Sequence, residues 1–436
     1  MKRMDLKALT GVFLILFSLT APVRLLADEY SLEDLFRIAL TRSEKLKAAE
    51  ETLVISEIGK DKAYSYLLPR VTATAGYTQY TEKKYYGTSV IQPNYGSSWG
   101  IRIDETFSLS GRELTGLEIA KANVTKSTHD LTAVREDYLL RYVAVAYYSA
   151  LMARKGLEIA DANLERLTTY RNAAEARLKI GEVTRTVLLR AEGELSGAKS
   201  DSLQAKNSLE LALAVLANNC GIRDPLTLSE SASEERVLSP LNVFQEQAYS
   251  ARADLRSLEV QKQIAADQTK FAEGAYWPNL SIFGGYTGAD QSPPPTSLNR
   301  ESLYAGAALN FPFFEGGLRK AEVREAKARE RQAALYYEDL KKTIEIEVRT
   351  AYLDLVTQKG ILRFLNDQMV FARDNYRAVA RQFEFGLSSS LDVLDANTLL
   401  VSAERRVASA LYNYRLALLR MKKATGTLLG NEAWSK

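Results

Sequence analysis

The sequence repeats one plan of elements after about 205 residues, and this duplication restricts the possible folds more than any other feature. Residues 69–78 (PRVTATAGYT) align with residues 278–287 (PNLSIFGGYT) at an offset of 209. Gly181 and Gly386 keep an offset of 205, so the spacing changes only where loops vary easily. Solenoid repeats are far shorter, about 20 to 50 residues. We therefore expect a duplicated half-protein.

Each half is predicted to contain a leading helix, two strands and two long helices. The first half, 28–225, has these at 31–66, 71–80, 99–109, 112–180 and 184–218. The second half, 242–436, has them at 242–275, 280–287, 303–313, 317–385 and 389–425, after a connector at 226–241. Prolines end both leading helices, because the residue before proline avoids the α region. Turns between the long helices are expected at Gly181 and Gly386, and a strand-to-helix corner at Gly316 and Gly317.

The last helix of each half carries a seven-residue pattern. Sustained heptads indicate left-handed supercoiling against a neighbouring helix. One heptad position holds Leu188, Leu195, Ser202, Leu209 and Leu216, then Val393, Leu400, Val407, Tyr414 and Met421. The other holds Ala191, Ala198, Ala205 and Ala212, then Ala396, Ala403, Ala410, Ala417 and Ala424.

The preceding helix of the first half is unusually long. As a single helix, 112–180 would span roughly 100 Å at ~1.5 Å per residue. That length suits a structure that bridges a distance better than a compact bundle.

The four predicted strands alternate apolar and polar side chains. In 99–109 the apolar face carries Trp99, Ile101, Ile103, Phe107 and Leu109, with Glu105 as the exception. Such alternation over about ten residues is typical of transmembrane strands, and also of strands half-buried on a soluble core. In lipid, four strands could not close a barrel, because open edges are not tolerated there and single-chain barrels begin at eight strands. Two chains would supply eight strands and three chains twelve.

The first 27 residues are predicted to be a signal peptide. Lys2, Arg3 and Lys7 precede a short apolar core at 11–19, and cleavage is expected after Ala27. The core is too short to span a bilayer as a helix. No cysteine lies near the cleavage position, so an N-terminal lipid anchor is not expected.

Composition argues against several classes of chemistry. With 57 basic and 54 acidic residues the net charge is only +3, so nucleic acid is not an expected partner. The single cysteine, Cys220, and the single histidine, His129, argue against an intrachain disulfide, a metal site and histidine-based catalysis. No phosphate-binding glycine motif occurs. We expect no enzyme and no cofactor. The alternative to a membrane channel is a soluble periplasmic coiled-coil scaffold or adaptor protein, which would leave the duplicated strands unexplained.

The chain resembles the TolC-like outer membrane efflux protein family over essentially its mature length. Besides the duplicated plan, the resemblance rests on residues 311–319 (FPFFEGGLR) and on residues 386–396 (GLSSSLDVLDA), which are similar to the family's periplasmic tip signature. It implies a mixed α/β membrane protein that forms a homotrimer. Four strands from each chain would form a twelve-stranded β-barrel, and this barrel would continue into an α-helical coiled-coil barrel.

The resemblance also implies a location and partners. The location would be the outer membrane of a Gram-negative-type bacterium, with contact to outer-membrane lipid and an extension into the periplasm. A periplasmic adaptor (membrane fusion) protein and an inner-membrane pump of RND or ABC type would dock to it. The channel would then export passively for a tripartite efflux or type I secretion complex.

By the same resemblance, Asp392 and Asp395 would ring the narrow periplasmic end of the channel. Two such charges ~6 Å apart repel by about 3 kcal/mol at an effective dielectric constant of ~20, so the ring would favour cations and resist tight closure. Asp392 also has a local interpretation, because Ser389 three residues earlier suggests a helix-capping box. The residues of the family's closed-state lock differ in this chain. Some members have an arginine, an aspartate and a tyrosine where this chain has Ser388, Val187 and Phe383. Arg185 and Arg190 are candidate substitutes.

Overall fold

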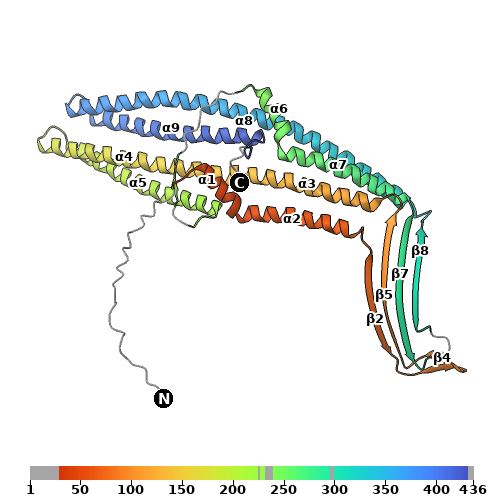
Figure 1. Ribbon diagram of the computed structural model, residues 1–436. Coiled ribbons are helices and arrows are strands. Elements are labelled where there is room, and N and C mark those ends of the chain that lie inside the picture. The colour runs from red at the N-terminus through yellow and green to blue at the C-terminus, as the bar shows by residue number, and fades with distance from the viewer. Residues whose placement is uncertain (1–28, 224–225, 231–238, 295–298, 431–436) are drawn as a thin grey trace, which may run out of the picture.

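The computed structural model describes residues 29–223, 226–230, 239–294 and 299–430, so the predicted signal peptide lies outside the described residues. The chain is strongly elongated (Figure 1). A four-stranded sheet lies at one end, and two helical hairpins, α4/α5 and α8/α9, reach the other end. The remaining helices connect the two ends.

Both halves of the chain run through these parts in the same order. The first half contains α1 (Leu32–Arg42), α2 (Glu44–Ser65), β2 (Arg70–Gln79), β5 (Tyr95–Ser108), α3 (Arg112–Tyr138), a π-helical segment (Leu139–Ala144), α4 (Val145–Lys179) and α5 (Arg185–Cys220). The second half contains α6 (Leu241–Ala251), α7 (Ala253–Glu273), a 3-10 turn (Gly274–Tyr276), β7 (Asn279–Ser292), β8 (Glu301–Asn310), α8 (Leu318–Glu384) and α9 (Ser390–Ala424). Short strands pair separately: β1 (Glu29–Tyr30) with β6 (Thr227–Leu228), and β3 (Lys84–Tyr86) with β4 (Ser89–Gln92).

Each leading helix is broken once, whereas the sequence predicted continuous helices over 31–66 and 242–275. The breaks lie at Ser43 and Arg252, which have extended backbone and are both buried. Each break packs against the end of a returning helix. A Cβ added to Gly426 would lie 2.7 Å from the backbone nitrogen of Arg252, and one added to Gly221 would lie 3.1 Å from the Cβ of Arg42. The helices therefore bend where another chain segment crosses them.

Other boundaries also differ from the prediction. The stretch between the predicted strands 71–80 and 99–109 contains the β3–β4 hairpin and the start of β5, and the expected connector at 226–241 contains β6. The strand predicted at 280–287 continues to Ser292. The strand predicted at 303–313 instead ends at Asn310, before Pro312, which has no N–H to donate to a strand ladder. The long stretch at 112–180 is helical but includes the π-helical turn.

The sheet is antiparallel, in the order β2-β5-β7-β8, and its register places apolar side chains on one face. Directly paired residues share a face. Ile101 pairs with Ala73 and Tyr286, and Tyr286 pairs with Leu303. The next row contains Arg102, which pairs with Thr72 and Gly285 and lies on the opposite face. Within the described residues, nothing pairs with the outer edges of β2 and β8.

Small residues bring the helices of each hairpin together. Ala191 and Ala198 of α5 are buried, and so are Ala396, Ala403, Ala410 and Ala417 of α9. These are the alanine positions of the predicted heptads. Alanine allows close approach of two helix backbones, and each buried leucine of the partner position adds roughly 1.5–3 kcal/mol. No helix within the described ranges is long and apolar enough to cross a lipid bilayer.

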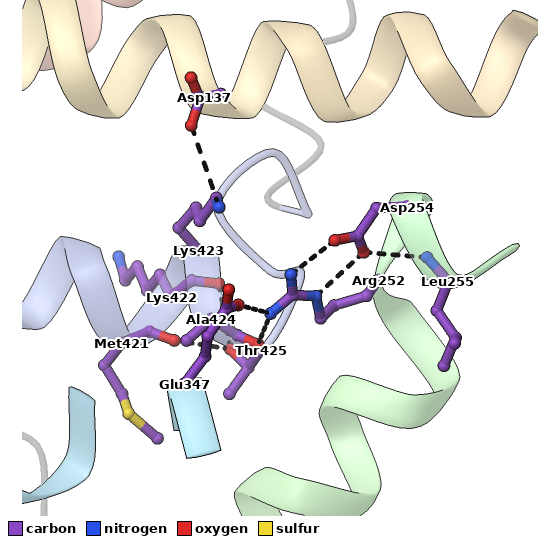
Figure 2. A network of polar contacts seen from close by, with 10 residues as sticks. All are labelled: Asp137, Arg252, Asp254, Leu255, Glu347, Met421, Lys422, Lys423, Ala424 and Thr425. Atoms are coloured by element: carbon purple, nitrogen blue, oxygen red, sulfur yellow. Dashed lines mark hydrogen bonds and ion pairs between the residues drawn. The ribbon is translucent and has the colours of Figure 1, made fainter. Parts of the chain in front are cut away.

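A buried arginine joins three elements of the second half near the middle of the molecule (Figure 2). Arg252, at the break between α6 and α7, donates hydrogen bonds to Asp254 Oδ2 at 2.5 Å, to Glu347 Oε2 of α8 at 2.5 Å and to the carbonyl of Ala424 at 3.4 Å. Its side chain is only 4% exposed. Beside it, Lys423 lies 3.9 Å from Asp137 of α3, so the cluster also reaches the first half of the chain.

Electrostatics in this cluster favour the charged forms. Burial alone would raise the pKa of Asp254, but hydrogen bonding and attraction from Arg252 outweigh it and hold that pKa below its usual range. A depressed carboxyl pKa stabilises the fold above the unfolded pKa, and this contribution is lost as the pH falls through the folded pKa. The carboxylates thus offset the cost of burying the guanidinium.

We predict that Arg252→Met destabilises the protein by about 3 kcal/mol, because it leaves two carboxylates and a carbonyl without their donor. Circular dichroism at 222 nm during thermal unfolding in detergent measures the loss. Arg256→Met in α7 is the control: it removes one exposed hydrogen bond to the carbonyl of Ser250 and no ion pair among the described residues, so it should change stability little. The difference between Arg252→Met and wild type should shrink as the pH falls through the depressed pKa of Asp254. Equal stability of the two variants would contradict this role.

Candidate gate at the free ends of the hairpins

Both hairpins turn at the predicted glycines. Gly181 and Gly386 have φ of 78° and 74°, a left-handed conformation that other residues rarely adopt. In each turn the N–H one residue after the glycine bonds a carbonyl five residues earlier: Glu182 to Arg177 at 3.0 Å and Leu387 to Gln382 at 2.8 Å. This is the Schellman pattern of helix ends, and it is the same in both halves.

The two hairpins differ in how their returning helix begins. Thr184, before α5, makes no side-chain capping bond. Before α9, Ser389 and Asp392 form a reciprocal capping box: Ser389 N–H donates to Asp392 Oδ2 at 2.9 Å, and Asp392 N–H donates to Ser389 Oγ at 3.2 Å. Hydrogen bonds from the Ser389 side chain and backbone lower the pKa of Asp392, so this carboxylate stays charged at neutral pH.

Asp395 lies one helical turn after Asp392, and both carboxylates are exposed on the same side of α9. They line one shallow groove together with Gln382, Ser388 and Leu399. Of the ion pairs between described residues, none involves Asp392 or Asp395. Each chain thus presents two negative charges, free of cationic partners within the described ranges, beside the tip turn of α8/α9.

The three residues that depart from the family lock have other contacts. Ser388 donates its hydroxyl hydrogen bond to the carbonyl of Val379 at 3.1 Å. Phe383 is buried in an apolar cluster with Leu167 and Ala174, and Val187 packs against this cluster. Arg185 and Arg190 make no ion pair with the two aspartates in the described part of the chain. They therefore do not replace the lock by direct pairing within one chain.

Sequence reasoning missed the residues of α4 that touch the second hairpin near this end, namely Asn163, Arg166, Tyr170 and Arg177. Their spacing of three, four and seven residues places them on one face of the helix. That spacing indicates a polar contact face on this helix. The sequence could not predict which residues this face contacts, because they lie more than 200 residues away along the chain.

The strand-to-helix corner after β8 is formed by Gly316 and Gly317, with φ of 62° and 88°. Chain neighbours aside, no heavy atom of the described ranges lies within 4 Å of a Cβ built on either glycine, so the backbone conformation rather than space requires glycine there. The corresponding corner before α3 uses Gly111, φ 73°, which sequence reasoning did not single out. The two corners orient the helices relative to the sheet.

Known proteins resemble this chain in both sequence and fold. The sequence profile of the family described as "Outer membrane efflux protein" matches residues 35–221 and 245–427, most of the chain. Outer membrane protein TolC of Vibrio cholerae is 24% identical over 376 residues, covering 84% of this chain and 83% of that protein. The alkaline protease secretion protein AprF of Pseudomonas aeruginosa is 25% identical over 299 residues, covering 66% and 62%. The solved CmeC outer membrane channel of Campylobacter jejuni has the same fold, with a TM-score of 0.79, 18% identity, and coverage of 91% and 86%.

We predict that Ser389→Ala loosens the first turn of α9, because it removes the acceptor of one capping bond and the donor of another. Loss of such a cap costs about 1 kcal/mol, which corresponds to roughly fivefold faster amide exchange. Hydrogen–deuterium exchange of peptides covering residues 389–397 measures it. Peptides at the start of α5 serve as the internal control and should be unchanged. Unaltered exchange in α9 would show that the capping box does not hold this turn.

Proposed function

Because the chain belongs to the outer membrane efflux protein family, we propose that three copies of it form one channel across the outer membrane and into the periplasm. Each copy would supply four strands to a twelve-stranded β-barrel, and its hairpins to a helical tunnel. The observation that carries this proposal is the sheet itself, which has one apolar face and, among the described residues, two unpaired edges, on β2 and β8.

The physical argument concerns the backbone groups along those edges. Water is absent from the bilayer core, and an unsatisfied N–H or C=O costs several kcal/mol there. Pairing β8 of one copy with β2 of the next satisfies both edges and closes the sheet into a barrel. The apolar row of Ile101 and Leu303 would then face lipid, and the row of Arg102 would face the water-filled interior.

The elongated shape supports a route from the periplasm to the outside. The hairpins lie at the end of the molecule opposite the sheet and finish in two separate turns (Figure 1). A periplasmic adaptor and an inner-membrane pump of RND or ABC type would dock at these turns. The chain would conduct passively, and the pump would supply energy and select the substrate. The name of the relative AprF refers to protease secretion, which makes type I secretion an alternative to small-molecule efflux for this chain.

At the tips, Asp392 and Asp395 of three copies would place six carboxylates around the tunnel entrance. Their exposure and the depressed pKa of Asp392 support a charged ring at neutral pH. Repulsion between the charges would oppose tight closure and attract cations. We therefore assign these residues the role of an electrostatic constriction.

Assembly is tested by membrane fractionation followed by gel electrophoresis with and without heating. We expect the mature protein in the outer-membrane fraction, running as a trimer until heated. A protein confined to the soluble periplasmic extract would instead support the scaffold or adaptor alternative.

The constriction is tested by single-channel recording in planar bilayers. Asp392→Asn with Asp395→Asn removes both charges yet keeps an oxygen acceptor for the capping box, so cation preference should fall severalfold. Ser389→Ala, which weakens the cap but keeps both charges, is the matched control and should retain cation preference. Identical ion selectivity in wild type and the double variant would contradict the constriction.

A further inference from the structure

The first half of the chain has one residue more than the second between its strand-to-helix corner and its hairpin tip. Gly111 and Gly317 are the residues before α3 and α8, and they are 206 residues apart. Both have positive φ, and the carbonyl of each accepts the first helical hydrogen bond, from the N–H four residues on. The tip glycines, Gly181 and Gly386, are only 205 residues apart. One step in the offset therefore lies inside a helix, although the sequence predicted steps only in loops.

The extra residue is absorbed in the π-helical turn Leu139–Ala144 between α3 and α4. The N–H of Val145 donates to the carbonyl of Leu140, five residues earlier, instead of to the carbonyl four residues earlier as in an α-helix. Such single wide turns are the usual form of π-helix inside long α-helices. In the second half, by contrast, α8 is α-helical from Leu318 to Glu384.

The buried side chains show that this turn keeps both flanking helices in phase. Tyr138 and Val143 are both buried and lie five residues apart. Their counterparts in α8, Ile344 and Val348, are also buried but lie four residues apart. Without a wide turn, one additional residue would rotate the whole of α4 by about 100° and move its apolar positions out of the core.

The same turn contacts the end of α5. The hydroxyl of Tyr138 donates to the carbonyl of Asn219 at 2.8 Å. The side-chain Nδ2 of Asn219 donates in return to the carbonyl of Tyr142, within the π turn, at 2.9 Å. Asn219 is thus held through both its backbone and its side chain, one residue before α5 ends at Cys220.

The second half holds the corresponding point by different chemistry. At the offset of 205, Asn219 matches Ala424 and Tyr142 matches Glu347. There the side chain of Arg252 donates to the carbonyl of Ala424 at 3.4 Å and to Glu347 at 2.5 Å. An arginine in the break of the leading helix therefore binds the end of α9, whereas a tyrosine beside the π turn binds the end of α5.

We infer that the π turn is a register-correcting joint that also docks the end of α5. It absorbs the additional residue of the first half, so that α4 leaves the joint with the same phase as α8. Through Tyr138 and the carbonyl of Tyr142 it takes the place that Arg252 has in the second half. This role goes beyond the proposed channel, because it concerns the folding of one chain.

Arg141 is the residue that the joint can lose. It is exposed, and its one ion pair among the described residues is with Asp137, four residues earlier, at 2.7 Å. Removing it leaves five residues between Tyr138 and Val145, as many as separate Ile344 from the matching position in α8. The π turn then becomes an ordinary α-helical turn, and no buried side chain changes its direction.

The first test is therefore the deletion of Arg141. We expect the purified protein in detergent to keep its circular dichroism at 222 nm and to unfold within about 5 °C of wild type. The matched control is the deletion of Arg349 in α8, an exposed arginine whose partner, Glu345, also lies four residues earlier, at 4.0 Å. Because α8 has no residue to spare, this deletion should abolish cooperative unfolding.

The second test measures hydrogen–deuterium exchange of peptides covering residues 214–223. Asn219→Ala removes the bond to the carbonyl of Tyr142, so the end of α5 should exchange roughly fivefold faster. Asn218→Ala is the control, since this exposed side chain makes no hydrogen bond within the described ranges and exchange should not change. Deletion of Arg141 should also speed exchange at this end, and adding Asn219→Ala should then have no further effect, because both changes remove one contact.

Each outcome supports or overturns a defined part of the inference. If deletion of Arg141 prevents folding as deletion of Arg349 does, or if both deletions fold equally well, the register role is wrong. If Asn219→Ala exchanges like Asn218→Ala, or if its effect adds in full to that of the deletion, the docking role is wrong. None of these results bears on the channel, which membrane fractionation and single-channel recording test separately.

Discussion

The backbone N–H and C=O groups along the outer edges of β2 and β8, which pair with nothing in the described part of the chain, are the constraint on which the rest of the structure depends. On its own, an open sheet of four strands leaves the backbone groups of its edges without hydrogen-bond partners and its apolar face uncovered. In the proposed trimer, neighbouring copies pair with both edges, and lipid covers the apolar face. The helices that leave the sheet must then follow the curve of a closed wall, which explains why their hairpins lie as a layer rather than as a compact bundle (Figure 1).

The two halves of the chain share one order of helices and strands, with different side-chain chemistry at matching positions. Ser43 and Arg252 occupy corresponding breaks. A glycine with positive φ at the end of a returning helix lies close to each break: Gly221 beside Arg42, and Gly426 beside Arg252. The first site is neutral, whereas the second holds a buried guanidinium with two carboxylates. The same division appears at the tips, where only the second half has a capping box with exposed aspartates. The second half thus carries the more specialised contacts.

Rigidity in the helical part follows from the kind of seam. Alanine and leucine heptads hold each hairpin as a unit, because separating them would expose apolar surface to water. The face of α4 toward the second hairpin combines a small apolar cluster with hydrogen-bonded arginines and asparagines. Polar contacts of this kind fix the position of the second hairpin at a lower cost of separation than an apolar seam would have.

Local features of the sequence determined a large part of this structure. The 205-residue period, the heptads, the alternation in the strands and the positions of Gly181, Gly386, Gly316 and Gly317 each follow from periodicity or from backbone freedom of single residues. The Ser389–Asp392 box was also readable, because its partners lie three residues apart. Only the tertiary structure decided that the leading helices break, that Arg252 is buried, and that Arg177 reaches Phe383. The physical reason is distance along the chain: Arg252 meets Ala424 across 172 residues and Arg177 meets Phe383 across 206, and no local pattern encodes which residues a fold brings together.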